Sequence, residues 1–119
     1  MGSKAPPHKN LKAWQYAMEL VRDVYTLTKK FPKEEMYGLT SQMRRAAISI
    51  PSNIAEGAAG RSNKHFASYL LNAVGSLAEL DTQIEISYSL DFINHKEKTV
   101  ILEKCNRVKA LTMGLKNSL

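Results

Sequence analysis

The stretch from Tyr37 to Arg61 constrains the fold most, because its apolar residues recur at spacings of three and four. An α-helix turns by roughly 100° per residue, so residues at these spacings share one face, which is typical of a helix packed on a core. We therefore expect one long helix from about Tyr37 to Gly57. Its core stripe consists of Leu39, Met43, Ala46, Ala47, Ile50 and Ile54. A second, narrower apolar strip, which favours contact with another subunit, consists of Ile48, Pro51 and Ala55.

Pro51 lies in the middle of this helical pattern. Proline has no N–H, and its ring crowds the carbonyl of Ala47, so we expect the helix to kink or to divide here. Ser49, Ser52 or water would then satisfy the freed carbonyls. A tolerated structural kink is favoured over the alternative, in which the freed polar groups form part of a site.

The end of the same helix carries Glu56, Gly57 and Gly60. Glycine often closes the last helical turn in a left-handed conformation, which predicts that role for these two glycines. A carboxylate at this end opposes the helix dipole. We therefore expect Glu56 to form a salt bridge, with Arg45 and Arg61 as its nearest candidates.

The same periodicity predicts three further helices, at about residues 10–30, 63–90 and 96–116. Asn94 and Glu97 have the spacing of a capping pair at the start of the last one. The core stripe of the first helix is predicted to be Leu11, Trp14, Met18, Val21 and Tyr25, with a second stripe of Ala13, Tyr16, Leu20 and Leu27. The core stripe of the third is Phe66, Leu70, Ala73, Leu77, Leu80, Ile84 and Tyr88. That of the fourth is Ile101, Cys105, Val108, Leu111 and Leu115.

These helices predict the fold class and the domain organisation. No segment shows the alternation of a strand, and the connections are short, so the expected fold is all-α, an antiparallel up-down-up-down four-helix bundle. The 119 residues suffice for one domain, at residues 10–119, after a flexible arm at residues 1–9.

The third helix also has a reverse face of small or apolar residues, namely Leu71, Gly75, Ala78, Thr82 and Ile86. Three helices thus share a second apolar or small-residue face, which predicts a homo-oligomer.

The sequence offers little for catalysis. His8, His65 and His95 lie far apart, and none stands at a metal-ligand spacing from Cys, Asp or Glu. We therefore expect no catalytic residues, no metal and no cofactor, and a protein that is not an enzyme. A lone cysteine, Cys105, suits a reducing compartment. With no apolar run of membrane-spanning length and no signal peptide, the expected location is the cytoplasm.

The net charge of +6 and the isoelectric point near 9.5 favour an anionic partner, nucleic acid first. Arginine binds phosphate oxygens bidentately and lysine binds them as a point charge. The first set of candidate contacts is Arg44, Arg45, Arg61 and Lys64, and the second set is Lys104, Arg107 and Lys109. Salt bridges to Glu56, Glu79 or Asp81 are an equally good interpretation of each arginine. The alternative function is a protein–protein adaptor that uses the apolar faces, with the charge incidental.

A pattern across most of the chain resembles a known family. The matching motifs are Leu11-x-x-Trp14-Gln15-x-Ala17, Tyr37-Gly38-Leu39-x-Ser41-Gln42-x-x-Arg45-Ala46-x-x-Ser49-Ile50, Asn53-Ile54-Ala55-Glu56-Gly57-x-x-x-Arg61 and Phe66-x-x-Tyr69-Leu70-x-x-Ala73-x-Gly75-Ser76-Leu77-x-Glu79-Leu80. They resemble the bacterial four-helix-bundle proteins encoded in intervening sequences of 23S ribosomal RNA genes, over about residues 10–115.

That resemblance implies an antiparallel four-helix bundle that assembles as a ring-shaped homopentamer. The family is also similar to the accessory protein of diversity-generating retroelements, which binds nucleic acid and a reverse transcriptase through basic surfaces. The resemblance thus implies RNA or a nucleoprotein as the partner of this chain.

Overall fold

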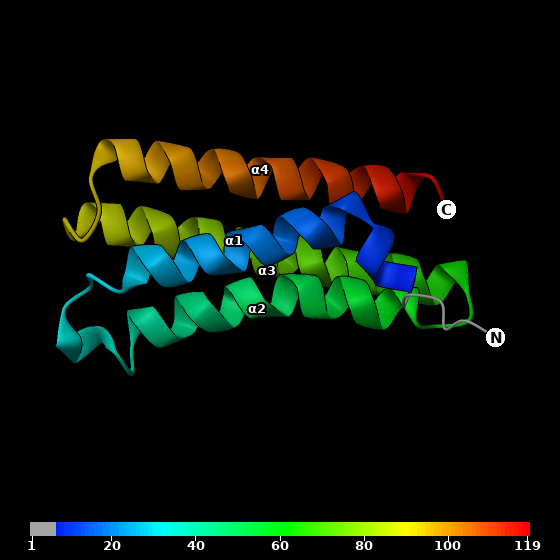
Figure 1. The fold of residues 1–119 in the computed structure, drawn as a ribbon, viewed down its shortest axis with the longest axis horizontal. Coiled ribbons are helices and arrows are strands. Elements are labelled where there is room, and N and C mark those ends of the chain that lie inside the picture. Colours follow the sequence, from blue (N-terminus) through cyan, green and yellow to red (C-terminus); the bar gives the residue numbers. More distant parts are fainter. Residues whose placement is uncertain (1–6) are drawn as a thin grey trace.

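Four antiparallel α-helices surround one core in the computed structural model, which describes residues 7–119 (Figure 1). The helices are α1 (Lys12–Thr28), α2 (Leu39–Ala58), α3 (Asn63–Ser89) and α4 (His95–Asn117), with short 3-10 helices η1 (Pro7–Asn10) and η2 (Lys33–Glu35). Each helix packs on its neighbour in the chain, and α4 closes the bundle by packing on α1. The predicted all-α, up-down-up-down four-helix bundle is therefore confirmed. Of the predicted N-terminal arm, residues 1–6 lie outside the described residues.

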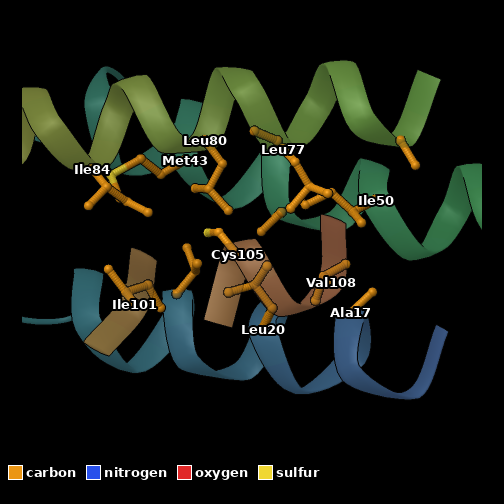
Figure 2. Close-up of a cluster of buried hydrophobic side chains, with 14 of the residues drawn as sticks. Ala17, Leu20, Met43, Ile50, Leu77, Leu80, Ile84, Ile101, Cys105 and Val108 are labelled. Atoms are coloured by element: carbon orange, nitrogen blue, oxygen red, sulfur yellow. The ribbon is translucent and has the colours of Figure 1, made fainter. Parts of the chain in front are cut away.

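The core lies along the axis of the bundle, and side chains from all four helices meet there (Figure 2). The predicted core stripes of α2, α3 and α4 are confirmed at their centres. Their fully buried members include Met43, Ile50, Ile54, Leu70, Leu80, Ile84 and Val108. Leu39, Phe66, Tyr88, Leu111 and Leu115 are partly buried and pack against this core. Within residues 7–119, no helix is long and apolar enough to cross a membrane.

The predicted core face of α1 is wrong in part: Leu11, Trp14 and Val21 are partly buried and pack against the core, but none of the five predicted residues is fully buried. The residues that α1 buries are Ala13, Ala17, Leu20, Val24 and Thr28. Met18 and Tyr25, expected inside, are 38% and 36% exposed. Because both stripes of α1 are apolar, hydrophobicity alone does not choose between them. The face that enters the core shares Ala13 and Leu20 with the predicted second stripe and adds Ala17 and Val24. Met18 lies outside the α1–α2 seam, and Trp14 is partly buried against the core.

Pro51 does not divide α2, which is helical from Leu39 to Ala58. Two serine side chains near the proline donate hydrogen bonds to backbone carbonyls, namely those of the residues before and after Ala47. Ser49 Oγ donates to the carbonyl of Ala46 and Ser52 Oγ to that of Ile48, each at 2.8 Å. Pro51 itself is buried, so packing offsets the missing backbone hydrogen bond.

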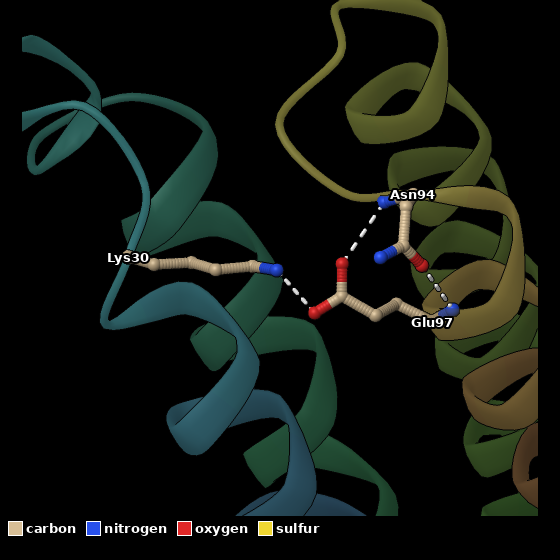
Figure 3. A network of polar contacts seen from close by, with 3 residues as sticks. All are labelled: Lys30, Asn94 and Glu97. Atoms are coloured by element: carbon tan, nitrogen blue, oxygen red, sulfur yellow. Dashed lines mark hydrogen bonds and ion pairs between the residues drawn. The ribbon is translucent and has the colours of Figure 1, made fainter.

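The α3–α4 turn ends in the capping pair that the sequence predicts (Figure 3). Asn94 Oδ1 accepts a hydrogen bond from the backbone N–H of Glu97 at 2.8 Å, and Glu97 Oε1 accepts one from that of Asn94 at 2.9 Å. The other carboxylate oxygen of Glu97 pairs with Lys30, just after the end of α1. This contact ties α4 to α1 at one end of the bundle.

Candidate nucleic-acid interface

Two polar contacts mark a cross-section that divides the bundle at about its middle. Ser49 of α2 donates to Ser76 of α3, with 2.6 Å between the two Oγ atoms. Lys104 of α4 pairs with Asp23 of α1, with 2.7 Å between Nζ and Oδ2. The α2–α3 turn and the C-terminal end of α4 lie on one side of this section, and η2 and the α3–α4 turn lie on the other (Figure 1).

Charge is distributed unequally between these halves. The half with the α2–α3 turn, residues 7–20, 50–76 and 105–119, has seven Lys and Arg residues but only two carboxylate side chains, Glu19 and Glu56. We call it the basic half. Its cations are Lys9, Lys12, Arg61, Lys64, Arg107, Lys109 and Lys116. The other half, residues 21–49 and 77–104, has nine cationic and nine acidic side chains and is called the neutral half.

All three ion pairs of the described residues involve the neutral half alone. They join Lys30 to Glu97, Lys98 to Glu85, and Lys104 to Asp23. The cations of the basic half therefore make no ion pair within residues 7–119, and all but the partly buried Lys116 are exposed. Such a surface attracts anions, because neighbouring positive charges add their potentials.

Of the first predicted set, Arg61 and Lys64 lie in the basic half. Both are exposed at the α2–α3 turn and the first turn of α3. Arg44 and Arg45 lie in the neutral half. Arg45 is exposed, whereas Arg44 Nε donates to Thr28 Oγ1 at 2.9 Å and its guanidinium lies 4.5 Å from the centre of the Tyr25 ring. The Arg44 side chain thus joins α2 to α1.

The second predicted set is distributed along α4. Lys104 is held by its ion pair with Asp23. Arg107 lies over the Tyr16 ring of α1, with its guanidinium carbon 5.0 Å from the ring centre. Lys109 is exposed and lines a shallow hollow between α3 and α4. Lys9, Lys12 and Lys116 were not among the predicted contacts. Few acidic residues lie near them in the sequence, but the segments that carry them come to one end of the bundle only in the fold.

The salt bridge expected for Glu56 is not present among residues 7–119. Glu56 Oε1 instead accepts a hydrogen bond from the Tyr69 hydroxyl of α3 at 3.3 Å. The negative charge of Glu56, and then this hydrogen bond, raise the pKa of Tyr69. A second ring lies beside it, since the centres of the His65 and Tyr69 rings are 4.7 Å apart. Asp81, another expected salt-bridge partner, also makes no ion pair within the described part of the chain.

The two glycines at this turn do not close α2 in a left-handed conformation, which corrects the prediction. Among the described residues only Asp91 has a positive φ, 62°. Gly57 lies inside α2 and is buried, because α3 packs directly against it: a Cβ at this position would lie 2.7 Å from Tyr69 Cβ. A Cβ at position 60 would lie 1.9 Å from His65 Cδ2. Gly57 thus makes room for the close approach of α3, and Gly60 makes room for the imidazole of His65.

Two further surfaces involve the predicted second apolar faces of α2 and α3, whereas the predicted second stripe of α1 has Ala13 and Leu20 in the core. A hollow of about 290 Å³ lies outside the α1–α2 seam and is lined by Trp14, Met18, Val21, Ile48, Pro51, Ser52 and Ala55. On the outer face of α3, Leu71 and Ile86 are 49% and 41% exposed, and a methyl group at Gly75 would meet no atom within 4 Å. No three His, Cys, Asp or Glu side chains gather as a metal site within residues 7–119.

Comparison with known proteins identifies relatives of this fold. The sequence profile of the 23S rRNA-intervening sequence protein family matches residues 9–114. Among solved structures, a protein of unknown function from the S23 ribosomal protein family of Bacteroides thetaiotaomicron superposes with a TM-score of 0.81. The two chains are 19% identical, over 88% of this chain and 95% of the other, so that likeness shows the fold alone. No curated protein matches the chain.

Proposed function

Since the chain belongs to the family of 23S rRNA-intervening sequence proteins, we propose that it is a non-enzymatic protein that binds RNA, free or within a nucleoprotein, through its basic half. The observation that carries this proposal is the charge division of the bundle. Seven cationic and two acidic side chains share one half, and none of those cations is neutralised by an ion pair among the described residues.

The dimensions of the bundle allow these charges to act together. Its two short axes are 30 and 21 Å, so one phosphate backbone that crosses this end can reach several of the cations, although salt screens the cations from one another beyond roughly 10 Å at 0.1 M. A phosphate backbone that crosses this end meets several cations at once and releases condensed counterions. Contacts of this kind fix the position of the RNA and read little of its sequence.

The proposal ranks the candidate residues. Arg61 and Lys64 are the central contacts, because both are exposed at the turn. Arg107 and Lys109 extend the surface along α4. Arg44, Arg45 and Lys104 belong to the neutral half, and we assign them a smaller share of the binding. Arg44 and Lys104 are also engaged in contacts with α1.

We also propose that copies of the chain associate through the apolar surface outside the α1–α2 seam and the outer face of α3. These surfaces differ from each other, so their contact is head-to-tail, and such contacts form a ring when the rotation between copies closes. The resemblance to the family implies five copies. In a ring whose axis runs along the bundles, every basic half faces the same side.

The alternative function is a protein–protein adaptor, and the apolar hollow between Trp14 and Ile48 favours it. In that case the hollow holds a partner protein and the charge division has no binding role. Salt separates the two functions, because phosphate contacts weaken steeply with salt and apolar contacts do not.

Fluorescence anisotropy with a labelled structured RNA tests the proposal, at about 50 and 200 mM salt. Arg61→Ala/Lys64→Ala is compared with Lys29→Ala/Lys33→Ala, which removes the same charge from exposed residues of the neutral half. We expect the binding constant to fall by at least about tenfold over this salt range. Arg61→Ala/Lys64→Ala should reduce the slope of log K against log salt concentration by roughly two, and Lys29→Ala/Lys33→Ala should leave that slope nearly unchanged. Equal effects of both variants, or no binding at the lower salt, would contradict the proposal.

A further inference from the structure

We infer that His65 and Tyr69 form a base-stacking site in the basic half, so that the preferred ligand is single-stranded RNA rather than a duplex. This inference rests on the proposed function and adds to it the class of RNA. A duplex offers phosphates but keeps its bases stacked on one another. A single strand offers bases whose faces are free to stack on aromatic side chains.

The two rings form a pair on one face of α3. Residues four apart on a helix are neighbours, and the ring planes of His65 and Tyr69 are inclined by 42° with their centres 4.7 Å apart. Both side chains are partly exposed, and Arg61 and Lys64 near them in the chain are exposed. Aromatic rings among exposed cations are what single-strand binding needs, because the cations hold the backbone while the rings receive the bases.

The ring pair is held in place by backbone contacts. The imidazole of His65 occupies the space that a side chain at position 60 would fill, and the Cβ of Tyr69 lies against Gly57, which positions the base of that side chain. The hydroxyl of Tyr69 is fixed by Glu56 at 3.3 Å. A platform that is already ordered loses little conformational entropy when a base stacks on it.

The chain contains a matched control for this site. Tyr88 and His95 form a second Tyr–His pair, with ring centres 6.1 Å apart, in the neutral half. Its neighbour Lys98 is engaged with Glu85 at 3.0 Å and lies over the Tyr88 ring. Replacing His95 by alanine therefore removes an imidazole from a Tyr–His pair, as His65→Ala does, but outside the basic half.

The test compares a labelled unpaired RNA strand with a labelled RNA duplex of the same length, by anisotropy at low salt. Wild-type protein should bind the single strand more tightly. His65→Ala should weaken single-strand binding by about tenfold, the size of one lost base stack, and leave duplex binding within about twofold. His95→Ala should change neither. Tyr69→Phe, which keeps the ring and removes only its hydroxyl, should retain the single-strand preference.

The outcomes separate this inference from the function on which it rests. Salt-dependent binding of both RNAs with no single-strand preference, or an equal loss on both in His65→Ala, overturns the stacking site and leaves RNA binding standing. Absence of binding to either RNA overturns both. Circular dichroism of each variant confirms that the bundle is folded, so a loss of binding is assigned to the surface.

Discussion

Tyr69 packs so closely on Gly57 that a Cβ at position 57 would lie 2.7 Å from the Cβ of Tyr69. That Cβ would also lie 3.0 Å from the ring of Phe66 and 3.3 Å from the backbone carbonyl oxygen of Phe66. A glycine inside a helix lowers helix stability by about 1 kcal/mol relative to alanine. At position 57 this loss accompanies the close contact between α2 and α3. This contact sets the position of both Tyr69 and the turn that carries Arg61.

Gly57→Ala should therefore destabilise the protein by about 1–3 kcal/mol, although alanine is the better helix former. The added methyl group must push α2 and α3 apart, because its nearest neighbours include backbone. Gly114→Ala is the control, since a methyl group there would meet no atom within 4 Å and should stabilise α4 by about 0.5–1 kcal/mol. Urea unfolding followed by circular dichroism measures both. A Gly57→Ala variant as stable as wild type would show that the helices do not pack this closely.

Glu97 should make stability depend on pH. Its hydrogen bond with Lys30, and then that with the backbone of Asn94, lower the pKa of this carboxyl in the folded protein. The stabilisation is present above the ordinary pKa of about 4.3 and is lost as the pH falls through the lowered folded value. Glu97→Gln should cost roughly 0.5 kcal/mol at pH 7 and nearly nothing at about pH 2.

Unfolding by urea at several pH values measures the Glu97→Gln difference. Glu103→Gln provides the control, because this exposed carboxylate on the same helix makes no ion pair within residues 7–119. A difference between wild type and Glu97→Gln that stays constant from pH 7 to pH 2 would be inconsistent with the ion pair.

Cys105 should be chemically inert in the folded protein. Burial, and then the negative charge of Asp81, raise the pKa of its thiol to about 12. The thiolate is the reactive species, so almost none is present at pH 8. We expect a thiol reagent such as dithionitrobenzoate to react within seconds in denaturant and orders of magnitude more slowly without it. Rapid reaction under native conditions would show that the α3–α4 seam opens.

Charges placed outside the α1–α2 seam should block assembly without unfolding the bundle. Met18 and Ile48 are 38% and 43% exposed, so glutamates at these positions remain in contact with water in the monomer. Analytical ultracentrifugation should show a larger species for wild type and a monomer for Met18→Glu/Ile48→Glu. Val100→Glu, at a position 44% exposed on α4, should assemble as wild type does. A wild-type monomer would contradict the proposed oligomer.

The sequence predicts the helices better than it predicts how they face one another. In α3 the apolar stripe from Leu70 to Ile84 is the stronger of its two faces, and the predicted core residues are buried. In α1 both faces are apolar, so periodicity does not distinguish the stripe with Leu20 from the stripe with Met18. Tertiary packing decides between them. Pro51 shows the same limit, because the sequence predicts a kink or a division there and α2 is not divided, with Ile50 and Ile54 buried on either side of the proline.

The candidate site is only partly readable from the sequence. Arg61 and Lys64 stand in a stretch with few acidic residues, and this signal is local. The ion pair of Lys104 with Asp23 joins residues that are distant in the chain, so no sequence pattern indicates that this lysine is engaged. The basic half is itself a property of the fold, since antiparallel packing brings three acid-poor segments to one end.

Lysine footprinting tests the binding of RNA by the basic half most directly, because both halves carry exposed lysines in one molecule. The acetylation rate of each lysine is measured by mass spectrometry with and without a saturating structured RNA. Protection is predicted at Lys9, Lys12, Lys64 and Lys109, and unchanged rates at Lys29, Lys33 and Lys96. Protection spread evenly over both halves, or confined to the neutral half, would contradict the proposed interface.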